Sequence, residues 1–232
     1  MRVVDIVKIM DSMAPSNLTD SWDNTGFQLG NMGKEVKKVL VALDLDLVTF
    51  KKAKEVQADM IITHHPLIFR PLKKITSESY KGKLILDIIK EDIAVYSAHT
   101  NLDIVDGGVN DVLAELLGLR EVEVLKCTQK EPLEYGYGRI GNIDETPIPN
   151  FLNKLKEKLE VNNLKVFGKT DGNINRIALC GGSGGDFIQD AHDKSADIYI
   201  TGDIKYHEAQ LANELNLLLI DAGHYNTEKI IL

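Results

Sequence analysis

The hydrophobic and polar residues alternate along the chain in a pattern typical of α/β proteins. Six short apolar runs rich in Val and Ile each stop in polar, Gly or His residues, as expected of parallel strands buried on both faces. These runs lie within residues 38–46, 58–65, 93–103, 176–186, 196–208 and 215–228. Helical periodicity separates them, at residues 48–57, 82–91, 108–118, 150–160, 186–195 and 206–215. The sequence therefore predicts an α/β fold with mainly parallel sheets built from βαβ units.

The pattern also predicts two domains. The periodicity weakens over residues 125–150, where prolines stand among glycines, and we place a domain crossing near residue 124. The last predicted strand is followed by a histidine, as strands of the first half are, which favours a return to the first domain near residue 210. We expect a discontinuous first α/β domain, residues 1–124 and 210–232, that carries the metal ligands, and a second α/β domain, residues 125–209. The final residues, TEKIIL, have the pattern of a helix cut short, so we expect the natural chain to continue.

The composition argues against several classes of protein and of binding partner. The 232 residues include 35 acidic and 27 basic ones, a formal charge of −8, which argues against a dedicated nucleic-acid binder and leaves only a local basic face for that role. Cys127 and Cys180 form no C-x-x-C spacing, so neither a disulfide framework nor a thiolate zinc site is indicated. The N-terminal segment is amphipathic, and no run of about 18 apolar residues follows. We expect a cytoplasmic protein that does not span a membrane.

Three of the predicted strands are followed by histidine. His64 and His65 follow the second apolar run, His99 follows the third, and His224 follows the sixth. Ligands of parallel α/β sheets gather outside the carboxyl ends of the strands, so these imidazoles are expected to lie where a ligand binds. The side chains of two adjacent residues point in different directions where a strand ends. The His64–His65 pair can therefore point at two different partners, such as two metal ions.

Two carboxylates follow these histidines in the sequence at the same spacing. Asp103 lies four residues after His99, and Glu228 lies four residues after His224. The second pair shares one helix face if a helix begins near Gly223. Imidazole and carboxylate ligands without thiolate suit Zn²⁺, Mn²⁺ or Fe²⁺. Two such ions can lower the pKa of a bridging water to about 7 and attract an anionic substrate.

Other interpretations of these residues stay open. A histidine beside an apolar strand is often a structural residue that is hydrogen-bonded to the backbone. His99 lies in a loop without fixed geometry, so contact with a ligand residue or with substrate fits its position as well as direct ligation. His207, and still more His192, is expected to be solvated in a helix.

Two glycine-containing segments have simple explanations as turns. Residues 180–186, CGGSGGD, lack the Lys-Ser/Thr of a P-loop, and a tight strand-to-helix turn explains them better than a phosphate cradle. Residues 21–30, SWDNTGFQLG, hold the only tryptophan, Trp22. Turn chemistry explains the Asn-Thr-Gly within them, although this polar cluster could also line a cleft.

Five segments, in order, are similar to the motifs of the Nif-three-like family, also called GTP cyclohydrolase I type 2. They are WDNTGFQLG, ITHHPLIF, SAHTNLD, TGDIKYHEA and DAGHYNTE. The resemblance spans nearly the whole chain and implies two α/β domains flanking a central cleft with a dinuclear metal centre. It also implies a homo-oligomer, commonly a toroidal hexamer. The metal ligands that it implies in this sequence are His64, His65, Asp103, His224 and Glu228.

These observations lead to one interpretation and a rival. The first is a metal-dependent hydrolase acting on a nucleotide or an anionic phosphorylated small molecule, GTP cyclohydrolase-like by resemblance. In it His99 would be the catalytic residue that moves a proton or orients a ligand. The rival is a non-catalytic assembly factor or metallochaperone that presents its metal site to a partner protein or nucleic acid. No guanine-specific motif in the sequence decides between them, and a shared scaffold does not fix the chemistry.

Overall fold

The computed structural model describes residues 1–129 and 134–232 and has the predicted α/β architecture, with two sheets and flanking helices. Residues 130–133, in the segment of weakened periodicity, lie outside the described residues. Across the described part of the chain, no helix combines the length and the apolar character needed to cross a membrane.

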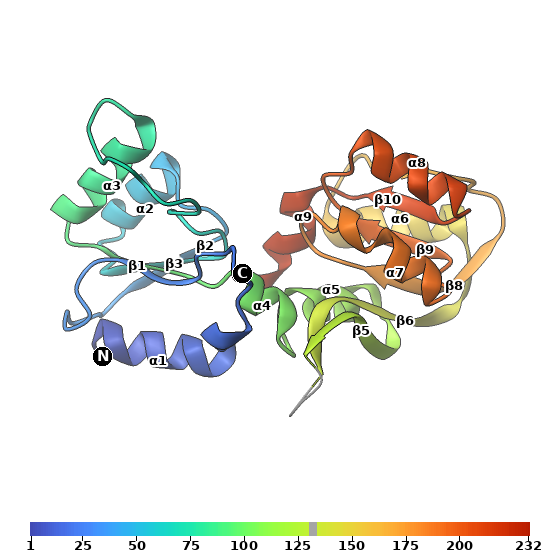
Figure 1. Ribbon diagram of the computed structural model, residues 1–232, viewed down its shortest axis with the longest axis horizontal. Helices are drawn as coiled ribbons and strands as arrows, with labels where there is room; N and C mark the ends of the chain where they lie inside the picture. The colour runs from blue at the N-terminus through green and yellow to red at the C-terminus, as the bar shows by residue number, and fades with distance from the viewer. Residues whose placement is uncertain (130–133) are drawn as a thin grey trace. The chain divides into compact units, whose positions relative to one another are not determined.

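The first unit comprises Met1–Val105 together with Leu232. Its elements are α1 (Val3–Met13), η1 (Ser16–Leu18), β1 (Gly26–Leu29), β2 (Val39–Ala42), α2 (Leu47–Glu55), β3 (Met60–Thr63), α3 (Tyr80–Lys90), β4 (Ala94–Ser97) and α4 (Thr100–Ile104). The sheet has the order β1-β4-β3-β2, in which β2, β3 and β4 are parallel and β1 is an antiparallel edge strand. In Figure 1, α2 and α3 cover one face of this sheet and α1 covers the other.

The core of the first unit has two halves, one on each face of its sheet. Phe50 of α2 and Leu84 of α3 belong to the same buried cluster as Ile61. Val3 of α1 belongs to a second buried cluster with Tyr96. Because β3 and β4 contribute residues to both clusters, they are buried on both faces, as the apolar runs predict.

The second unit comprises Asp106–Ile231. Its elements are α5 (Val109–Leu117), β5 (Arg120–Gln129), β6 (Tyr135–Pro147), α6 (Ile148–Leu159), β7 (Lys165–Phe167), β8 (Asn173–Leu179), η2 (Gly185–Phe187), α7 (Ile188–Asp193), β9 (Ile198–Thr201), α8 (Tyr206–Glu214), β10 (Leu218–Asp221), α9 (His224–Glu228) and η3 (Lys229–Ile231). The strand order is β5-β6-β8-β9-β10-β7. Residues of α5 and α6 belong to the core on one face, and residues of α7 and α8 to the core on the other.

The second sheet is mixed rather than mainly parallel. Among the described residues of this sheet, the β8–β9 and β9–β10 pairings are parallel, whereas β5–β6, β6–β8 and β10–β7 are antiparallel. The segment of weakened periodicity contains the whole of β6, which pairs with both β5 and β8. The α/β class is therefore confirmed, and the antiparallel part of this sheet is a correction to the predicted pattern.

The division between the units differs from the one expected from the sequence. The sequence favours residues 1–124 with 210–232 as one domain and 125–209 as the other. In the structure, residue 124 lies inside β5, and β10 pairs with β9 and β7 of the second sheet. Strand pairing therefore groups residues 210–231 with the second unit.

Short polar signals fix where the helices begin. The carboxylate of Asp46 accepts a hydrogen bond from the backbone N–H of Thr49, 2.8 Å away, at the start of α2. Ser79 caps α3 in the same way through the N–H of Gly82. Such caps satisfy backbone donors that have no partner within the helix. The expected helix at 82–91 accordingly begins two residues earlier, after Ser79.

Candidate metal centre

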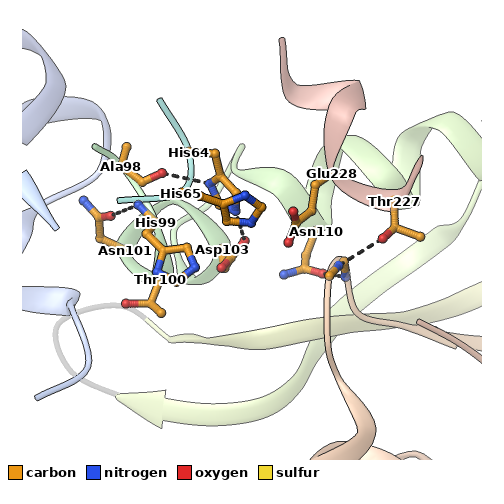
Figure 2. A network of polar contacts seen from close by, with 12 residues as sticks. His64, His65, Ala98, His99, Thr100, Asn101, Asp103, Asn110, Thr227 and Glu228 are labelled. Carbon is orange, nitrogen blue, oxygen red and sulfur yellow. Dashed lines mark hydrogen bonds and ion pairs between the residues drawn. The ribbon is translucent and has the colours of Figure 1, made fainter. Parts of the chain in front are cut away.

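The strand register brings three histidines of the first unit to one edge of its sheet. β3 and β4 are parallel, and Thr63 pairs with Ser97 at the carboxyl ends of both strands. Their hydroxyl oxygens lie 2.9 Å apart and share a hydrogen bond. His64 and His65 directly follow β3, and His99 is the second residue after β4. The structure thus brings these three side chains together, as Figure 2 shows.

Each of these histidines is tethered through Nδ1. The Nδ1 atom of His64 lies 2.8 Å from the carbonyl oxygen of Ala98, which can only accept a hydrogen bond (Figure 2). Nδ1 must therefore carry the proton, and Nε2 of the neutral ring carries the lone pair that a metal requires. His65 Nδ1 lies 2.9 Å from Oδ1 of Asp44, and His99 Nδ1 lies 2.8 Å from Oδ1 of Asp23. All three rings are thus held in the tautomer suited to ligation through Nε2.

The three imidazoles are close enough to share a metal ion. One ligand nitrogen from each of His64, His65 and His99 lies within 4.8 Å of the others. The ring centroids are 5.0 to 5.6 Å apart. A carboxylate joins them, since Oδ1 of Asp103, on α4, lies 3.6 Å from Nε2 of His64. The geometry of the first unit thus offers imidazole and carboxylate donors together, and it admits His99 as a ligand as well as a catalytic group.

Asp23 anchors His99 and the start of α4. Its side chain is fully buried and also accepts hydrogen bonds from the hydroxyls of Thr25 and Thr100 and from the backbone N–H of Thr100. Burial alone would raise the pKa of Asp23. The hydrogen bond and charge of His99, with the hydroxyl bonds, outweigh burial and hold that pKa well below its usual range. Asp23 is therefore a carboxylate at neutral pH, which favours a proton on Nδ1 of His99.

The second unit contributes a second donor pair. His224 and Glu228 are the first and last residues of α9, and Gly223 is the N-cap, so they share a helix face as the sequence predicts. Nε2 of His224 lies 3.0 Å from Oε2 of Glu228, whose side chain is 5% exposed. Nδ1 of His224 lies 2.8 Å from Oδ2 of Asp203. The ring is thus tethered through Nδ1 like the other three.

A glycine loop packs directly against this second pair. It joins β8 to η2, and its residue Gly182 has a left-handed φ of +67°. The backbone N–H groups of Gly181, Gly182 and Gly184 donate to side-chain oxygens of Asn110, Thr227 and Thr201, respectively. These bonds support the interpretation of CGGSGGD as a tight turn rather than a phosphate cradle, because those three donors already have partners.

The sequence pattern does not predict three carboxylates that form hydrogen bonds to the candidate histidines. Asp23, Asp44 and Asp203 each accept from Nδ1 of a candidate histidine. Each lies near a strand end, in SWDNTG, VALDLD and TGDIKY respectively, but their spacing from the histidines follows no fixed period. His192 and His207 are on α7 and α8, with Asp193 and Gln210 as neighbours. Neither belongs to a metal-binding group among the described residues.

The fold and these donor sets define an α/β protein with candidate sites for divalent metal ions, built on histidines that follow its strands. The whole length, residues 1–232, matches the Duf34/NIF3 (NGG1p interacting factor 3) family, and the chain belongs to that family. The family resemblance drawn from the five sequence motifs is thereby confirmed.

Individual relatives agree with this assignment. The chain is 40% identical over 235 residues to a Clostridium perfringens protein named GTP cyclohydrolase 1 type 2 homolog, covering 100% of this chain and 88% of the relative. A Lactococcus lactis protein of the same name is 42% identical over 229 residues, covering 97% and 86%. The crystal structure of a Bacillus cereus protein related to NIF3 matches with a TM-score of 0.94 at 30% identity, covering 100% of this chain and 90% of the other.

Proposed function

We propose that this protein is a metal-dependent hydrolase that acts on a nucleotide or another phosphorylated small molecule. The proposed ligands of its two divalent metal ions are His64, His65, Asp103, His224 and Glu228. The observation that carries the proposal is the common tether, in which Nδ1 of each proposed histidine ligand bonds to a carbonyl or carboxylate oxygen. A hydrogen bond of this kind orients a metal-binding imidazole and raises its basicity. The names of the curated relatives support the nucleotide part of the proposal.

The donor chemistry fits divalent ions of the first transition row. Three imidazoles and two carboxylates, without thiolate, suit Zn²⁺, Mn²⁺ or Fe²⁺. Two doubly charged ions with two carboxylate ligands leave a net positive charge, which favours an anionic substrate. Bound at these residues, the ions would supply Lewis acidity and an activated water for hydrolysis. His99, held through Nδ1 by Asp23, would present Nε2 to accept a proton or to orient the substrate.

Purified protein loaded with metal is expected to hold close to two divalent ions per chain. Five protein ligands exceed the four positions of one tetrahedral zinc, and they suit two ions that share bridging water. Elemental analysis measures the content. His64→Ala and His224→Ala should each lower it, whereas His192→Ala and His207→Ala, on exposed helix surfaces, should leave it unchanged. If the wild-type chain binds at most one ion, and neither His64→Ala nor His224→Ala lowers that content, the dinuclear proposal is wrong.

We further propose that the chain forms a homo-oligomer of closed symmetry, a hexamer by family resemblance. Exposed apolar side chains such as Val48 and Ile89 offer surface for such contacts. Light scattering at micromolar concentration measures the mass. A monomer under those conditions would contradict this proposal.

Turnover tests the hydrolase function itself. Metal-loaded protein is incubated with a panel of nucleotides and phosphoesters, and the products are separated by chromatography. We expect at least one substrate to be hydrolysed in a manner that depends on His64. Turnover that persists at full rate in the His64→Ala variant would point to a contaminating enzyme and would count against the proposal.

A further inference from the structure

Three aromatic rings meet beside the histidines of the first unit. Trp22, Phe69 and His99 have centroids 5.9 to 6.3 Å apart, and each pair of planes meets at 69° to 85°. We call this group the aromatic corner. Trp22 is 58% exposed and Phe69 is 37% exposed, so part of both large apolar side chains faces solvent. An exposed tryptophan packed edge-on to a second aromatic ring is a surface suited to a planar, partly apolar ligand.

The aromatic corner is held in place by polar contacts on both sides. The amide of Asn24, two residues after Trp22, donates to the carbonyl oxygen of Ile68, next to Phe69. The backbone N–H of Ile68 donates to Oε1 of Gln28, 2.9 Å away. Asp23, adjacent to Trp22, is the carboxylate that holds His99. The loops that carry the rings are therefore fixed to one another before any ligand binds, which lowers the ordering cost of binding.

A basic segment follows the aromatic corner directly. Arg70, Lys73 and Lys74 lie within five residues of Phe69, and all three are exposed. Such clustering contrasts with the formal charge of −8 for the whole chain. Guanidinium and ammonium groups bind phosphate oxygens, and aromatic faces stack on heterocyclic bases. The chain thus carries an exposed basic segment within five residues of the ring platform, and the charge of that segment suits an anionic group.

We propose that the aromatic corner is a subsite for a planar heteroaromatic ring, and that Arg70, Lys73 and Lys74 bind the anionic group attached to that ring. The inference rests on the proposed function and narrows its substrate class to heteroaromatic phosphates such as nucleoside monophosphates. A ring stacked on Trp22 and Phe69 lies next to His99. The ring of the bound molecule is thereby placed near the proposed metal-binding residues of the first unit.

The single tryptophan makes the subsite directly measurable. Binding of AMP, GMP, adenosine and ribose 5-phosphate is followed by Trp22 fluorescence and by calorimetry, with the full-length protein both metal-loaded and stripped by chelator. We expect AMP or GMP to bind and quench fluorescence in both preparations, adenosine to bind more weakly, and ribose 5-phosphate to cause no quenching. Phe69→Leu and Trp22→Leu should each weaken nucleotide binding by about 5- to 100-fold, the contribution of one stacked ring.

Matched variants separate the ring platform from general surface effects. Tyr206, on α8, is 79% exposed, so Tyr206→Leu removes an aromatic ring that is more accessible than Trp22 or Phe69 and should leave binding unchanged. The double change Lys73→Ala with Lys74→Ala should weaken AMP and GMP but not adenosine, because it removes only positive charge.

Several outcomes would overturn the subsite. These are an absence of nucleotide binding to the wild-type protein, quenching by ribose 5-phosphate equal to that by AMP, and unchanged affinity in Trp22→Leu and Phe69→Leu. If Trp22→Leu instead alters the oligomer mass and no nucleotide binds, the aromatic corner is a contact between copies. Metal content and turnover are measured on the same samples. If the protein binds metal and turns over substrate but no nucleotide ring binds at the aromatic corner, only the subsite is rejected. If the ring binds there but the protein neither holds metal nor turns over substrate, only the proposed function is rejected.

Discussion

Replacing Gly182 with alanine is expected to weaken metal binding strongly at the second unit's donor pair, His224 and Glu228. A Cβ built at this position would overlap with Oε1 of Glu228 and lie 3.3 Å from Nε2 of His224. Glu228 is almost fully buried, so its carboxylate has little space into which it can move. The Glu228 carboxylate would therefore leave the position that it holds in the wild-type chain, and the His224 ring would have to shift slightly. We expect metal affinity to fall by more than about 10- to 100-fold, the usual effect of losing an outer-shell contact.

A second glycine in the same unit controls for backbone strain. Gly182 has a φ of +67° and Gly118, at the end of α5, has a φ of +77°, so alanine costs about 1–2 kcal/mol at either position. A Cβ at Gly118 would meet only Nζ of Lys154, at 3.9 Å. Gly118→Ala should therefore lose only the thermal stability that this backbone strain costs, with no loss of metal. Metal content by elemental analysis and melting by circular dichroism measure both effects. Equal metal retention in the two variants would show that Gly182 has no part in placing Glu228.

The parts of the structure that the sequence predicts correctly are those with local signals. The six predicted helices all occur, and each apolar run contains all or most of a strand. β4, β9 and β10 are buried along their whole length, whereas β2 is less buried and its Val41 is 55% exposed. The helix that begins at His224 follows from Gly223 and from the four-residue spacing to Glu228. Histidines that follow parallel strands converge because the register of β3 and β4 aligns the ends of those strands. Period and residue type suffice for these features.

Features that depend on long-range pairing were not predictable in this way. The sequence does not predict β6, because its glycines resemble those of a loop. In the structure these glycines are needed where neighbouring strands approach closely. A Cβ at Gly136 would overlap with the carbonyl oxygen of Lys126, and one at Gly138, with φ of +63°, would lie 2.6 Å from the carbonyl oxygen of Leu179. The partners of β10 also follow from pairing rather than local pattern, which explains the different division into units.

The carboxylates that tether the histidines illustrate the same limit within the site. Asp23 and His99 are 76 residues apart in the chain, and Asp44 and His65 are 21 apart. No helical or strand period relates the members of such pairs. The sequence predicts which residue types gather at the strand ends, but the tautomer of each imidazole becomes apparent only once its Nδ1 partner is known.

The separation of a catalytic role from a ligand role rests on His99 and Asp103. His99→Asn is expected to keep both metals, because losing an outer-shell group weakens metal affinity by only about 10- to 100-fold. The same change should slow hydrolysis by about 10²- to 10⁴-fold, since it removes a proton-transfer group that Asp23 holds in place. Asp103→Asn should do the reverse and empty at least one metal position, because it removes a ligand charge beside His64.

Metal content and hydrolysis rate, measured side by side for both variants, distinguish these roles. If His99→Asn loses metal as readily as Asp103→Asn, then His99 is a ligand, which its proximity to His64 and His65 allows. If His99→Asn keeps its metal and hydrolyses substrate at the wild-type rate, then the tether to Asp23 serves only the local fold. If no substrate in the panel turns over while two metals stay bound, the non-catalytic assembly factor becomes the better explanation. Transfer of those metals to an acceptor protein is then the activity to measure, because a metallochaperone must release the ions that a hydrolase retains.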